Sequence, residues 1–388
     1  MKRNKLVSTV LAAVLAGSVL AGCGSKTEAT QAATTVAETT AAEATTQAAE
    51  TTAAQETTPA AAETTAAAEE TKAAGETKSA AEPAAAETEA FGDTSEGAMR
   101  VGSLKGPTTM GLVNLMNEVE SGDKSGYLFE MQSQPDVIMS KLVSGDLDVA
   151  LLPANVAAIA YNKTNKGISV LDINTLGVLY CVTGDESIKS VKDLAGKTVI
   201  TTGQGASPEY VLTYLLDKNE VTDCTMEFKS EATEIAAALQ SDPQQIAILP
   251  QPFVTVATAQ NDQLQVAFSL TDEWDAVAPD SKLLTGVTVV RNDYLADHAD
   301  EVAAFIEDHK TSTAAAADDL DGTAELIAKY GILPKAQVAK KALPQCNIVA
   351  ITGEEMQTAL SGYLQVLFDQ NPKAVGGAMP DEGFYYVK

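Results

Sequence analysis

MRVGSLKGPTTMGLVNLM, residues 99–116, places a short strand-like run directly before a Gly-Pro turn and an amphipathic segment. Met99, Val101 and Leu104 are the apolar residues of the run, and Gly106 ends it. Pro107 suits the first position of a helix, and the apolar residues that follow recur at helical spacing. The stretch predicts a strand over 99–104 and a helix that begins at 107.

The same alternation of strand and helix continues through residue 155. Tyr127–Gln132 predicts a second strand, Pro135 opens a helix that Gly145 ends, and residues 148–152 predict a third strand. Strands joined in this way by single helices are typical of a parallel sheet with right-handed crossovers. We therefore predict an α/β architecture for this part of the chain.

A second, smaller unit of the same kind follows. Its expected strands and helices are Lys197–Thr201, Glu209–Asp217, Met226–Phe228, Ile235–Leu239, Gln245–Leu249 and Gln265–Ser269. Strand-like segments at 176–182 and 286–290 flank it, and the chain is then expected to be helical to about residue 368. This order predicts two lobes, in which 99–178 and 289–388 form lobe 1 and 179–288 form lobe 2. The chain would cross between them near 177–183 and 284–290.

The first 22 residues have the layout of a secretory signal. Basic residues at 2, 3 and 5 precede an apolar run, Leu6–Leu20, that is short for a membrane-spanning helix. The tetrad Leu-Ala-Gly-Cys that ends at Cys23 resembles the bacterial lipobox, in which the cysteine becomes the lipidated N-terminus. We expect Cys23 to anchor an extracytoplasmic protein to the bacterial cell membrane. The alternative is an ordinary signal peptide with a chance cysteine.

Residues 23–98 are a low-complexity segment of Ala, Thr, Glu and Gln. Such a composition cannot bury enough apolar surface to offset the entropy lost on ordering. We predict a disordered linker that contributes nothing to folding or ligand binding, with a specific adhesin stalk as the alternative.

The charge of the chain excludes several partners. It carries 26 basic and 53 acidic residues, a net charge of −27, so it lacks the basic stripe that nucleic-acid binding needs. Beyond the linker, Arg100 and Arg291 are the only arginines, which disfavours a site for a multiply charged anion. A neutral or cationic heterocycle, or a singly charged sulfonate or carboxylate, remains as the expected ligand.

The cysteines beyond Cys23 are Cys181, Cys224 and Cys346. Each lies in an apolar or strand-like run, where a free cysteine acts as a small hydrophobe. An odd number leaves at least one thiol unpaired. Since no Cys or His spacing suggests a metal, we expect neither a metal nor a cofactor.

Three stretches, together with the Gly-Pro-Thr-Thr turn, carry a family resemblance. They are SGDLDVALLPANVAA at 144–158, VKDLAGKTVITTGQGASPEYVLTYLL at 191–216 and QIAILPQPFVTVA at 245–257. Their succession resembles ABC-importer solute-binding proteins of the NMT1/THI5-like family, the nitrate, sulfonate, taurine and thiamine-precursor receptors, over about residues 100–370. The resemblance implies a type II periplasmic-binding-protein fold with two lobes joined by a two-strand hinge. It also implies a membrane permease that senses the closure of the lobes on a small solute. We expect a monomer without catalysis that delivers this solute to the permease and its ATPase.

Ligands of open α/β sheets bind beyond the carboxyl ends of the strands. The polar residues expected there are Thr108, Thr109, Gln134 and Asn155 in the larger lobe and Gln204, Gly205, Ser207 and Gln251 in the smaller one. The turn at 203–208 is the best candidate, because its glycines admit a ligand and a helix N-terminus favours an anion. The alternative for each position is structural, as a helix cap or a plain turn.

Trp274 is expected in a polar loop, either stacked on a heterocyclic ligand or half-buried as a loop anchor; Tyr180 and Tyr210 are similar cases. Two other functions remain open. A surface sensor or adhesin would use the same closing lobes. An enzyme on this fold is disfavoured, because His298 and His309 lie far in sequence from the candidate turns and Ser207 lacks a nucleophile elbow.

Overall fold

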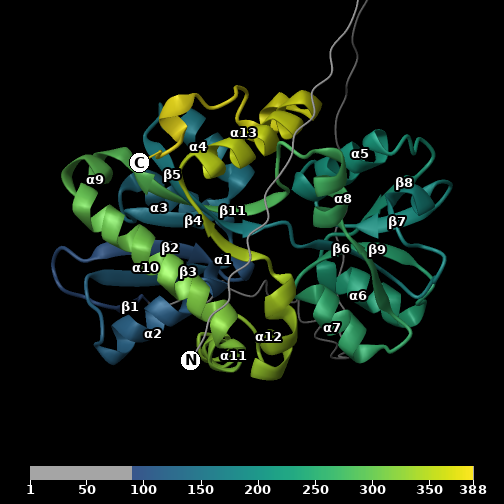
Figure 1. Ribbon diagram of the computed structural model, residues 1–388, viewed down its shortest axis with the longest axis horizontal. Coiled ribbons are helices and arrows are strands. Elements are labelled where there is room, and N and C mark those ends of the chain that lie inside the picture. The colour runs from purple at the N-terminus through teal and green to yellow at the C-terminus, as the bar shows by residue number, and fades with distance from the viewer. Residues whose placement is uncertain (1–89, 388) are drawn as a thin grey trace, which may run out of the picture. The chain divides into compact units, whose positions relative to one another are not determined.

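The computed structural model describes residues 90–387, and two β-sheets organise them (Figure 1). The larger sheet contains β1 (Phe91–Gly92), β2 (Met99–Leu104), β3 (Tyr127–Gln132), β4 (Val149–Pro153), β5 (Ile168–Leu176), β11 (Leu284–Arg291) and β12 (Ile348–Ile351), in the order β1-β3-β2-β4-β11-β5-β12. The smaller sheet contains β6 (Leu179–Thr183), β7 (Thr198–Thr201), β8 (Thr225–Phe228), β9 (Ile246–Pro250) and β10 (Gln265–Ser269), in the order β10-β6-β9-β7-β8.

Helices cover both sheets. Those of the larger lobe are α1 (Pro107–Met110), α2 (Val113–Ser121), α3 (Pro135–Ser144), α4 (Ala154–Lys163), α9 (Asn292–Asp297), α10 (Ala299–Asp318), α11 (Leu320–Lys329), α12 (Ala336–Ala342) and α13 (Gly353–Gln370). Those of the smaller lobe are α5 (Ser207–Lys218), α6 (Ala232–Ser241), α7 (Phe253–Gln260) and α8 (Leu270–Val277). Within residues 90–387, no helix is long and apolar enough to cross a bilayer.

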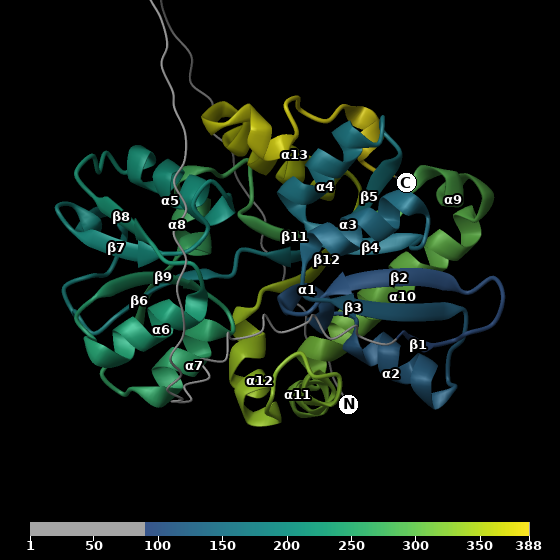
Figure 2. The same cartoon turned by 180° about the vertical axis from the view of Figure 1, so that it is seen from behind.

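The central strands of the larger sheet, β4, β11 and β5, are buried on both faces. In β4, Ala150 and Leu152 pack into a core with α3, α4 and α13, while Val149 and Leu151 pack into a core with α2, α10 and α11. Figure 2 shows the two sheets from behind, with α1 at the inner end of β2. β2 pairs in parallel with both β3 and β4, which confirms the parallel βαβαβ unit predicted from residues 99–155.

The crossings between the lobes differ in position from those predicted. The strand expected over 176–182 is two strands, because β5 ends at Leu176 in the larger sheet and β6 begins at Leu179 in the smaller one. All of β11 pairs with β4 and β5 in the larger sheet. The second crossing therefore precedes Leu284, and the predicted lobe boundary at 288 falls inside a strand.

The predicted linker ends earlier than residue 98. Phe91 and Gly92 form a short edge strand that pairs antiparallel with β3. The Phe91 ring stacks between Phe129 and Tyr330, with ring centroids 6.0 and 5.4 Å apart. The contribution of these residues to folding was missed, because their partners are remote in sequence. Residues 1–89, which include the predicted signal segment, Cys23 and most of the linker, lie outside the described residues.

Removing residues 1–96 is expected to lower the free energy of unfolding by about 1–3 kcal/mol relative to the mature chain. Each of the two ring contacts of Phe91 contributes about 0.5–1.5 kcal/mol beyond area burial. Denaturant unfolding of both proteins measures the difference, and Phe91→Ala in the mature chain should reproduce most of it. Equal stability of the shortened and mature chains would show that β1 does not stabilise the lobe.

A polar chain is buried inside the larger lobe. His309 on α10 is fully buried, and its Nδ1 lies 3.0 Å from Oδ2 of Asp172, which is 1% exposed on β5. Oδ1 of Asp172 accepts a hydrogen bond of 2.7 Å from Thr288 on β11, and Thr288 accepts one of 3.1 Å from Asn174. These side chains fasten α10 to the two strands that continue into the crossings.

Candidate functional site

A cavity of about 190 Å³ lies where the carboxyl ends of β4 and β9 meet the first turn of α5. Both lobes and both crossings contribute to its wall. It is lined by Pro153, Gly177, Val178, Leu179, Ser207, Pro208, Val211, Pro250, Leu283, Leu284, Thr285 and Tyr363. We call this space the inter-lobe cavity. Its position at strand ends of two α/β sheets is the place where ligands of such sheets bind.

The wall of the inter-lobe cavity is apolar apart from a few hydroxyl groups. Ser207, Thr285 and Tyr363 supply these hydroxyls, and no lining residue is charged. Ser207 hydrogen-bonds the hydroxyl of Tyr363. Burial raises the pKa of Tyr363 to about 12, although the bond from Ser207 acts in the opposite direction. Tyr363 is therefore neutral at physiological pH, and the pair can offer a solute hydrogen bonds without a charge.

The two threonines of the Gly-Pro-Thr-Thr turn bond to their own lobe. The hydroxyl of Thr109 is fully buried, 2.9 Å from Oγ of Ser103, and it also donates to the carbonyl of Leu104. Thr108 donates to the same carbonyl at 3.1 Å. A Cβ on Gly286 would lie 2.6 Å from the methyl group of Thr108, so Thr108 packs against the strand β11. Neither threonine lines the inter-lobe cavity.

The glycine turn before α5 already holds an anion from its own chain. The N–H of Gly205 donates a 2.5 Å hydrogen bond to the carboxylate of Glu209, and Tyr210 donates to the Gly205 carbonyl at 3.0 Å. Gln204 and Gly205 are exposed, whereas Ser207 faces the cavity. An anionic ligand at this helix start would have to displace the carboxylate of Glu209.

Gln251 points away from the inter-lobe cavity. Its side chain is 2% exposed and its amide donates to Oε1 of Gln345 at 2.6 Å, while Thr255 donates to its oxygen at 2.9 Å. Tyr180 of the same lobe donates to the carbonyl of Gln345 at 2.7 Å. Because Gln345 follows α12 of the larger lobe, these bonds connect the two lobes. In Figure 1, α12 lies beside α7 of the smaller lobe.

The last two predicted residues lie outside the cavity lining. Gln134 is exposed at the N-cap of α3, and its side chain makes no capping bond there. Asn155 is half-buried in the first turn of α4, two residues beyond the lining residue Pro153. Of the predicted ligand-binding residues, only Ser207 lines the inter-lobe cavity.

Trp274 does not lie in a loop. It is fully buried in α8, with its ring centroid 4.7 Å from that of Tyr214 and 5.8 Å from that of Tyr363. Its indole N–H donates to Ser281 at 3.3 Å. The acidic residues around it in sequence occupy the outer face of an amphipathic helix, so the expectation of a polar loop was wrong. The ring of Trp274 packs against the ring of Tyr363, which lines the inter-lobe cavity.

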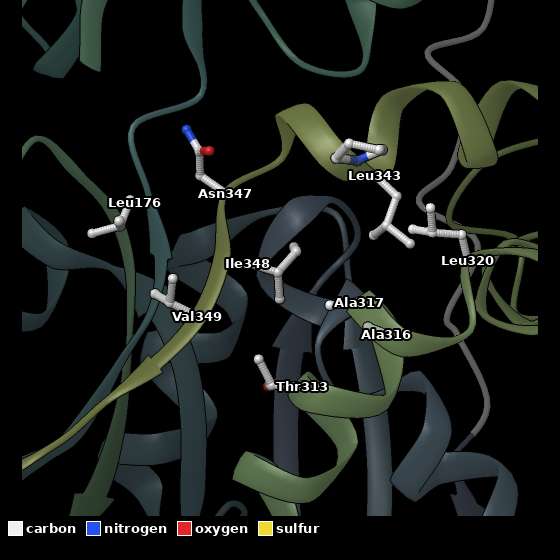
Figure 3. A pocket seen from close by; sticks show the side chains of 10 residues that line it. Leu176, Thr313, Ala316, Ala317, Leu320, Leu343, Asn347, Ile348 and Val349 are labelled. Atoms are coloured by element: carbon white, nitrogen blue, oxygen red, sulfur yellow. The ribbon is translucent and has the colours of Figure 1, made fainter. Parts of the chain in front are cut away.

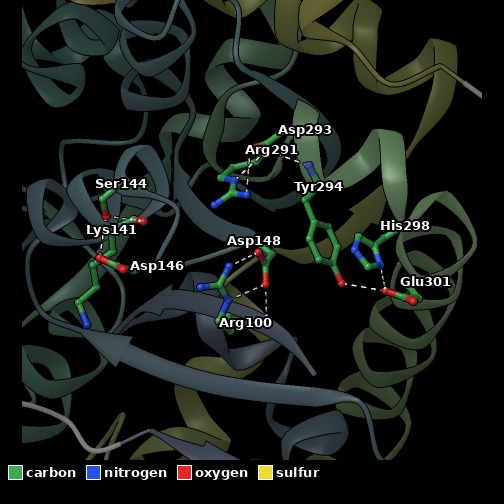
Figure 4. A network of polar contacts seen from close by, with 10 residues as sticks. All are labelled: Arg100, Lys141, Ser144, Asp146, Asp148, Arg291, Asp293, Tyr294, His298 and Glu301. Atoms are coloured by element: carbon green, nitrogen blue, oxygen red, sulfur yellow. Dashed lines mark hydrogen bonds and ion pairs between the residues drawn. The ribbon is translucent and has the colours of Figure 1, made fainter. Parts of the chain in front are cut away.

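Both arginines of the described chain lie at the far end of the larger sheet (Figure 4). Arg100 at the start of β2 donates two hydrogen bonds, of 2.9 and 2.5 Å, to the carboxylate of Asp148. Arg291 at the end of β11 likewise donates two hydrogen bonds, of 2.9 and 3.1 Å, to the carboxylate of Asp293. Their guanidinium groups are therefore engaged far from the end of β4 that reaches the inter-lobe cavity.

Burial raises the pKa of each of the three cysteine thiols, which disfavours their thiolate form. Cys181, Cys224 and Cys346 are free, and burial raises the pKa of the Cys346 thiol to about 12. Burial likewise raises the pKa of Cys181 above its ordinary value. Among residues 90–387 no group of three His, Cys, Asp or Glu side chains is arranged to hold a metal ion.

The two sheets, their crossings and the cavity between them define a two-lobed α/β binding-protein fold. The NMT1/THI5-like family model matches residues 131–321, and this part of the chain is an NMT1/THI5-like domain. No curated protein matches the chain.

Solved structures share the fold. An ABC transporter protein from Parabacteroides distasonis is 22% identical with a TM-score of 0.65, over 76% of this chain and 100% of that one. The periplasmic aliphatic sulphonate-binding protein SsuA from Escherichia coli is 16% identical with a TM-score of 0.60, over 75% and 92%. The alkanesulfonate-binding SsuA of Xanthomonas axonopodis pv. citri, solved with MOPS, is 15% identical with a TM-score of 0.54, over 74% and 96%. These likenesses confirm the predicted periplasmic-binding-protein fold.

Proposed function

We propose that this protein is the solute-binding component of an ABC importer and that its solute is a small uncharged organic molecule. The observation that carries the proposal is the inter-lobe cavity, whose wall comes from both lobes and contains no charged side chain. The family and the named transport proteins of the same fold support the importer role.

The choice of an uncharged solute follows from what surrounds the inter-lobe cavity. A sulfonate or carboxylate that left water would need a cation or several donors to replace its hydration. The arginines are paired elsewhere, and Glu209 occupies the start of α5. Ser207, Thr285 and Tyr363 suit a neutral ring or chain with a few hydrogen-bonding groups. A heterocycle fits this wall better than the sulfonates named for the neighbours.

Closure of the lobes provides the transport signal in this proposal. The solute would contact Pro153 and Tyr363 of the larger lobe and Ser207 and Pro250 of the smaller lobe. Because these contacts come from both lobes, the solute binds the closed form more tightly than the open form. The crossings at 177–178 and 278–283 act as the hinge. A membrane permease and its ATPase would read the closed form of a monomer. A surface sensor would use the same motion. An enzyme is disfavoured, because no carboxylate, histidine or lysine side chain lines the inter-lobe cavity.

A thermal-shift panel of neutral heterocycles and of size-matched alkanesulfonates and carboxylates tests the solute class. A neutral compound at 100 times its Kd is expected to stabilise the protein by about 2.7 kcal/mol, and small-angle scattering should show compaction on its addition. If only anions stabilise the protein, the uncharged solute is wrong while solute binding stands. If a stabilising compound causes no compaction, hinge closure is wrong.

We propose further that Cys23 carries lipid and anchors the protein outside the cytoplasm. The Leu-Ala-Gly-Cys end of the signal-like segment supports this, and two acyl chains hold a protein stably at a membrane. Mass spectrometry of the membrane fraction should find residue 23 as the acylated N-terminus and no residues 1–22. A Cys23→Ser protein that fractionates with the membrane as strongly as the wild type would contradict the anchor.

A further inference from the structure

The C-terminal end of α13, in the larger lobe, holds α5 of the smaller lobe through two side-chain amides (Figure 1). Nε2 of Gln370 donates a hydrogen bond of 2.9 Å to the carbonyl of Tyr210. Nδ2 of Asn371 donates one of 2.8 Å to the hydroxyl of the same tyrosine, which is buried. We call Tyr210, Gln370 and Asn371 the α13 clasp.

The amide of Asn371 is held in the orientation that the clasp needs. Its Oδ1 accepts a hydrogen bond of 3.1 Å from the N–H of Lys373 and so caps the short 3₁₀ helix Pro372–Val375. With its oxygen fixed in this way, the amide can offer only its NH₂ group to another partner. The larger lobe therefore presents a donor, and the Tyr210 hydroxyl accepts from it.

The Tyr210 hydroxyl also reaches the glycine turn beside the inter-lobe cavity. While it accepts from Asn371, it donates to the carbonyl of Gly205 at 3.0 Å. Hydrogen bonds in such a chain polarise and strengthen one another. Gly205 has a φ of 71°, and Ser207, which follows in the same turn, lines the inter-lobe cavity. The larger lobe thus acts on this turn through one hydroxyl group.

The crossings are held to the larger lobe at some distance from the clasp. Asn347, at the edge of an apolar cavity of about 360 Å³ (Figure 3), donates from its amide to the carbonyl of Gly177 in the first crossing at 2.5 Å. The second crossing packs so closely on α13 that a Cβ on Gly362 would lie 2.9 Å from that of Ser281. Gln370 lies roughly 12 Å further along the helix, at about 1.5 Å per residue. A rotation about the crossings therefore separates the partners of the clasp.

We propose that the α13 clasp closes beside the inter-lobe cavity when the lobes meet, and that it then fixes the glycine turn of that cavity. When the lobes part, water replaces the two amides as partners of Tyr210, and the Gly205 carbonyl is held less firmly. None of the three clasp residues lines the inter-lobe cavity, so they are positioning residues. As a control on solute capture, the clasp rests on the proposed function.

Fluorine NMR of the single tryptophan reports the separation of the lobes without any solute. Trp274 of the smaller lobe packs against Tyr363 of the larger lobe, with ring centroids 5.8 Å apart, so parting the lobes changes the surroundings of a fluorinated indole. In the intact soluble chain, Tyr210→Phe and Asn371→Ala are each expected to raise the ratio of open to closed forms about two- to tenfold, the usual effect of one hydrogen bond.

Combined variants identify the bond that is lost. Tyr210→Phe together with Asn371→Ala should raise the ratio no further than either change alone, because both remove the same bond between the lobes. Gln370→Ala should add a factor of its own, since it bonds the Tyr210 carbonyl. Tyr294→Phe is the matched control. It removes a hydroxyl that donates to Glu301 at 2.9 Å within the larger lobe, and it should leave the ratio unchanged.

The effect on the glycine turn has a separate readout. In amide NMR spectra, the signal of Ala206, whose N–H follows the Gly205 carbonyl, is expected to shift in Asn371→Ala in the same direction as in Tyr210→Phe. An unchanged ratio of open to closed forms in both variants would overturn the clasp, and an unchanged Ala206 signal would overturn its action on the turn. If the clasp opens as expected but no compound of the thermal-shift panel binds, the clasp stands and the proposed solute class is wrong.

Discussion

Replacing Ser207 by phenylalanine is expected to lower the affinity for the solute at least about 100-fold, which corresponds to roughly 2.7 kcal/mol. The inter-lobe cavity measures only about 190 Å³, and the new ring would fill much of it. The substitution also removes the hydroxyl that bonds Tyr363. Calorimetric titration with the solute found in the thermal-shift panel measures the loss. Ser207→Ala removes the bond alone and should weaken binding only a few-fold to about tenfold.

Ser241→Phe provides the matched control, since Ser241 is exposed at the end of α6 in the same lobe. It should bind the solute as the wild type does. Both phenylalanine variants are expected to melt close to the wild type without solute, because Ser207 lies on the cavity wall and not in the core. Wild-type affinity in Ser207→Phe would mean that the solute binds elsewhere.

Removing the imidazole of His309 is expected to destabilise the fold strongly. His309→Ala leaves the carboxylate of Asp172 buried, with Thr288 as its remaining side-chain donor. Breaking a buried pair in this way typically costs about 3–5 kcal/mol. Denaturant unfolding measures the change. His298→Ala is the control, because His298 is partly exposed and pairs with Glu301 on the surface, where a pair contributes less than about 1 kcal/mol.

A double-mutant cycle separates the Asp172–His309 pair from the packing around it. Asp172→Leu and His309→Leu should each be costly, and the double variant should lose less stability than the two single losses together. The expected coupling is about 0.5–3 kcal/mol, the range for residues in direct contact. Additive losses, or a His309→Ala variant as stable as His298→Ala, would show that the pair contributes little.

Most strands of the fold could be predicted from local sequence, but β5 and β12 could not. Residues 99–104 and 127–132 alternate and end at turn residues, so β2 and β3 were predicted with their observed bounds. β5 was missed because ISVLDINTL is buried almost throughout and does not alternate. Its polar Asp172 is satisfied by His309, 137 positions later, which no local pattern reveals. β12 was missed because it is a short strand between helices.

The place of the candidate site followed from strand ends, but the directions of its side chains did not. The inter-lobe cavity lies at the ends of β4 and β9, next to the predicted turn at 203–208. Gln251 sits at such an end and still points away, since Gln345 of the other lobe provides its partner. Tyr363 lies in the middle of α13, where no turn or motif signals a site. Side-chain direction depends on partners that only the tertiary fold supplies.

Gln345 gives the two lobes a third attachment besides the two covalent crossings. It accepts one hydrogen bond at its backbone from Tyr180 and another at its side chain from Gln251. Two flexible connections alone would let one lobe twist as well as bend against the other. A third point of attachment removes part of the twist, so the open protein samples a narrower set of lobe orientations. Less orientational entropy is then lost when a solute closes the lobes, and a larger share of the contact free energy remains as affinity.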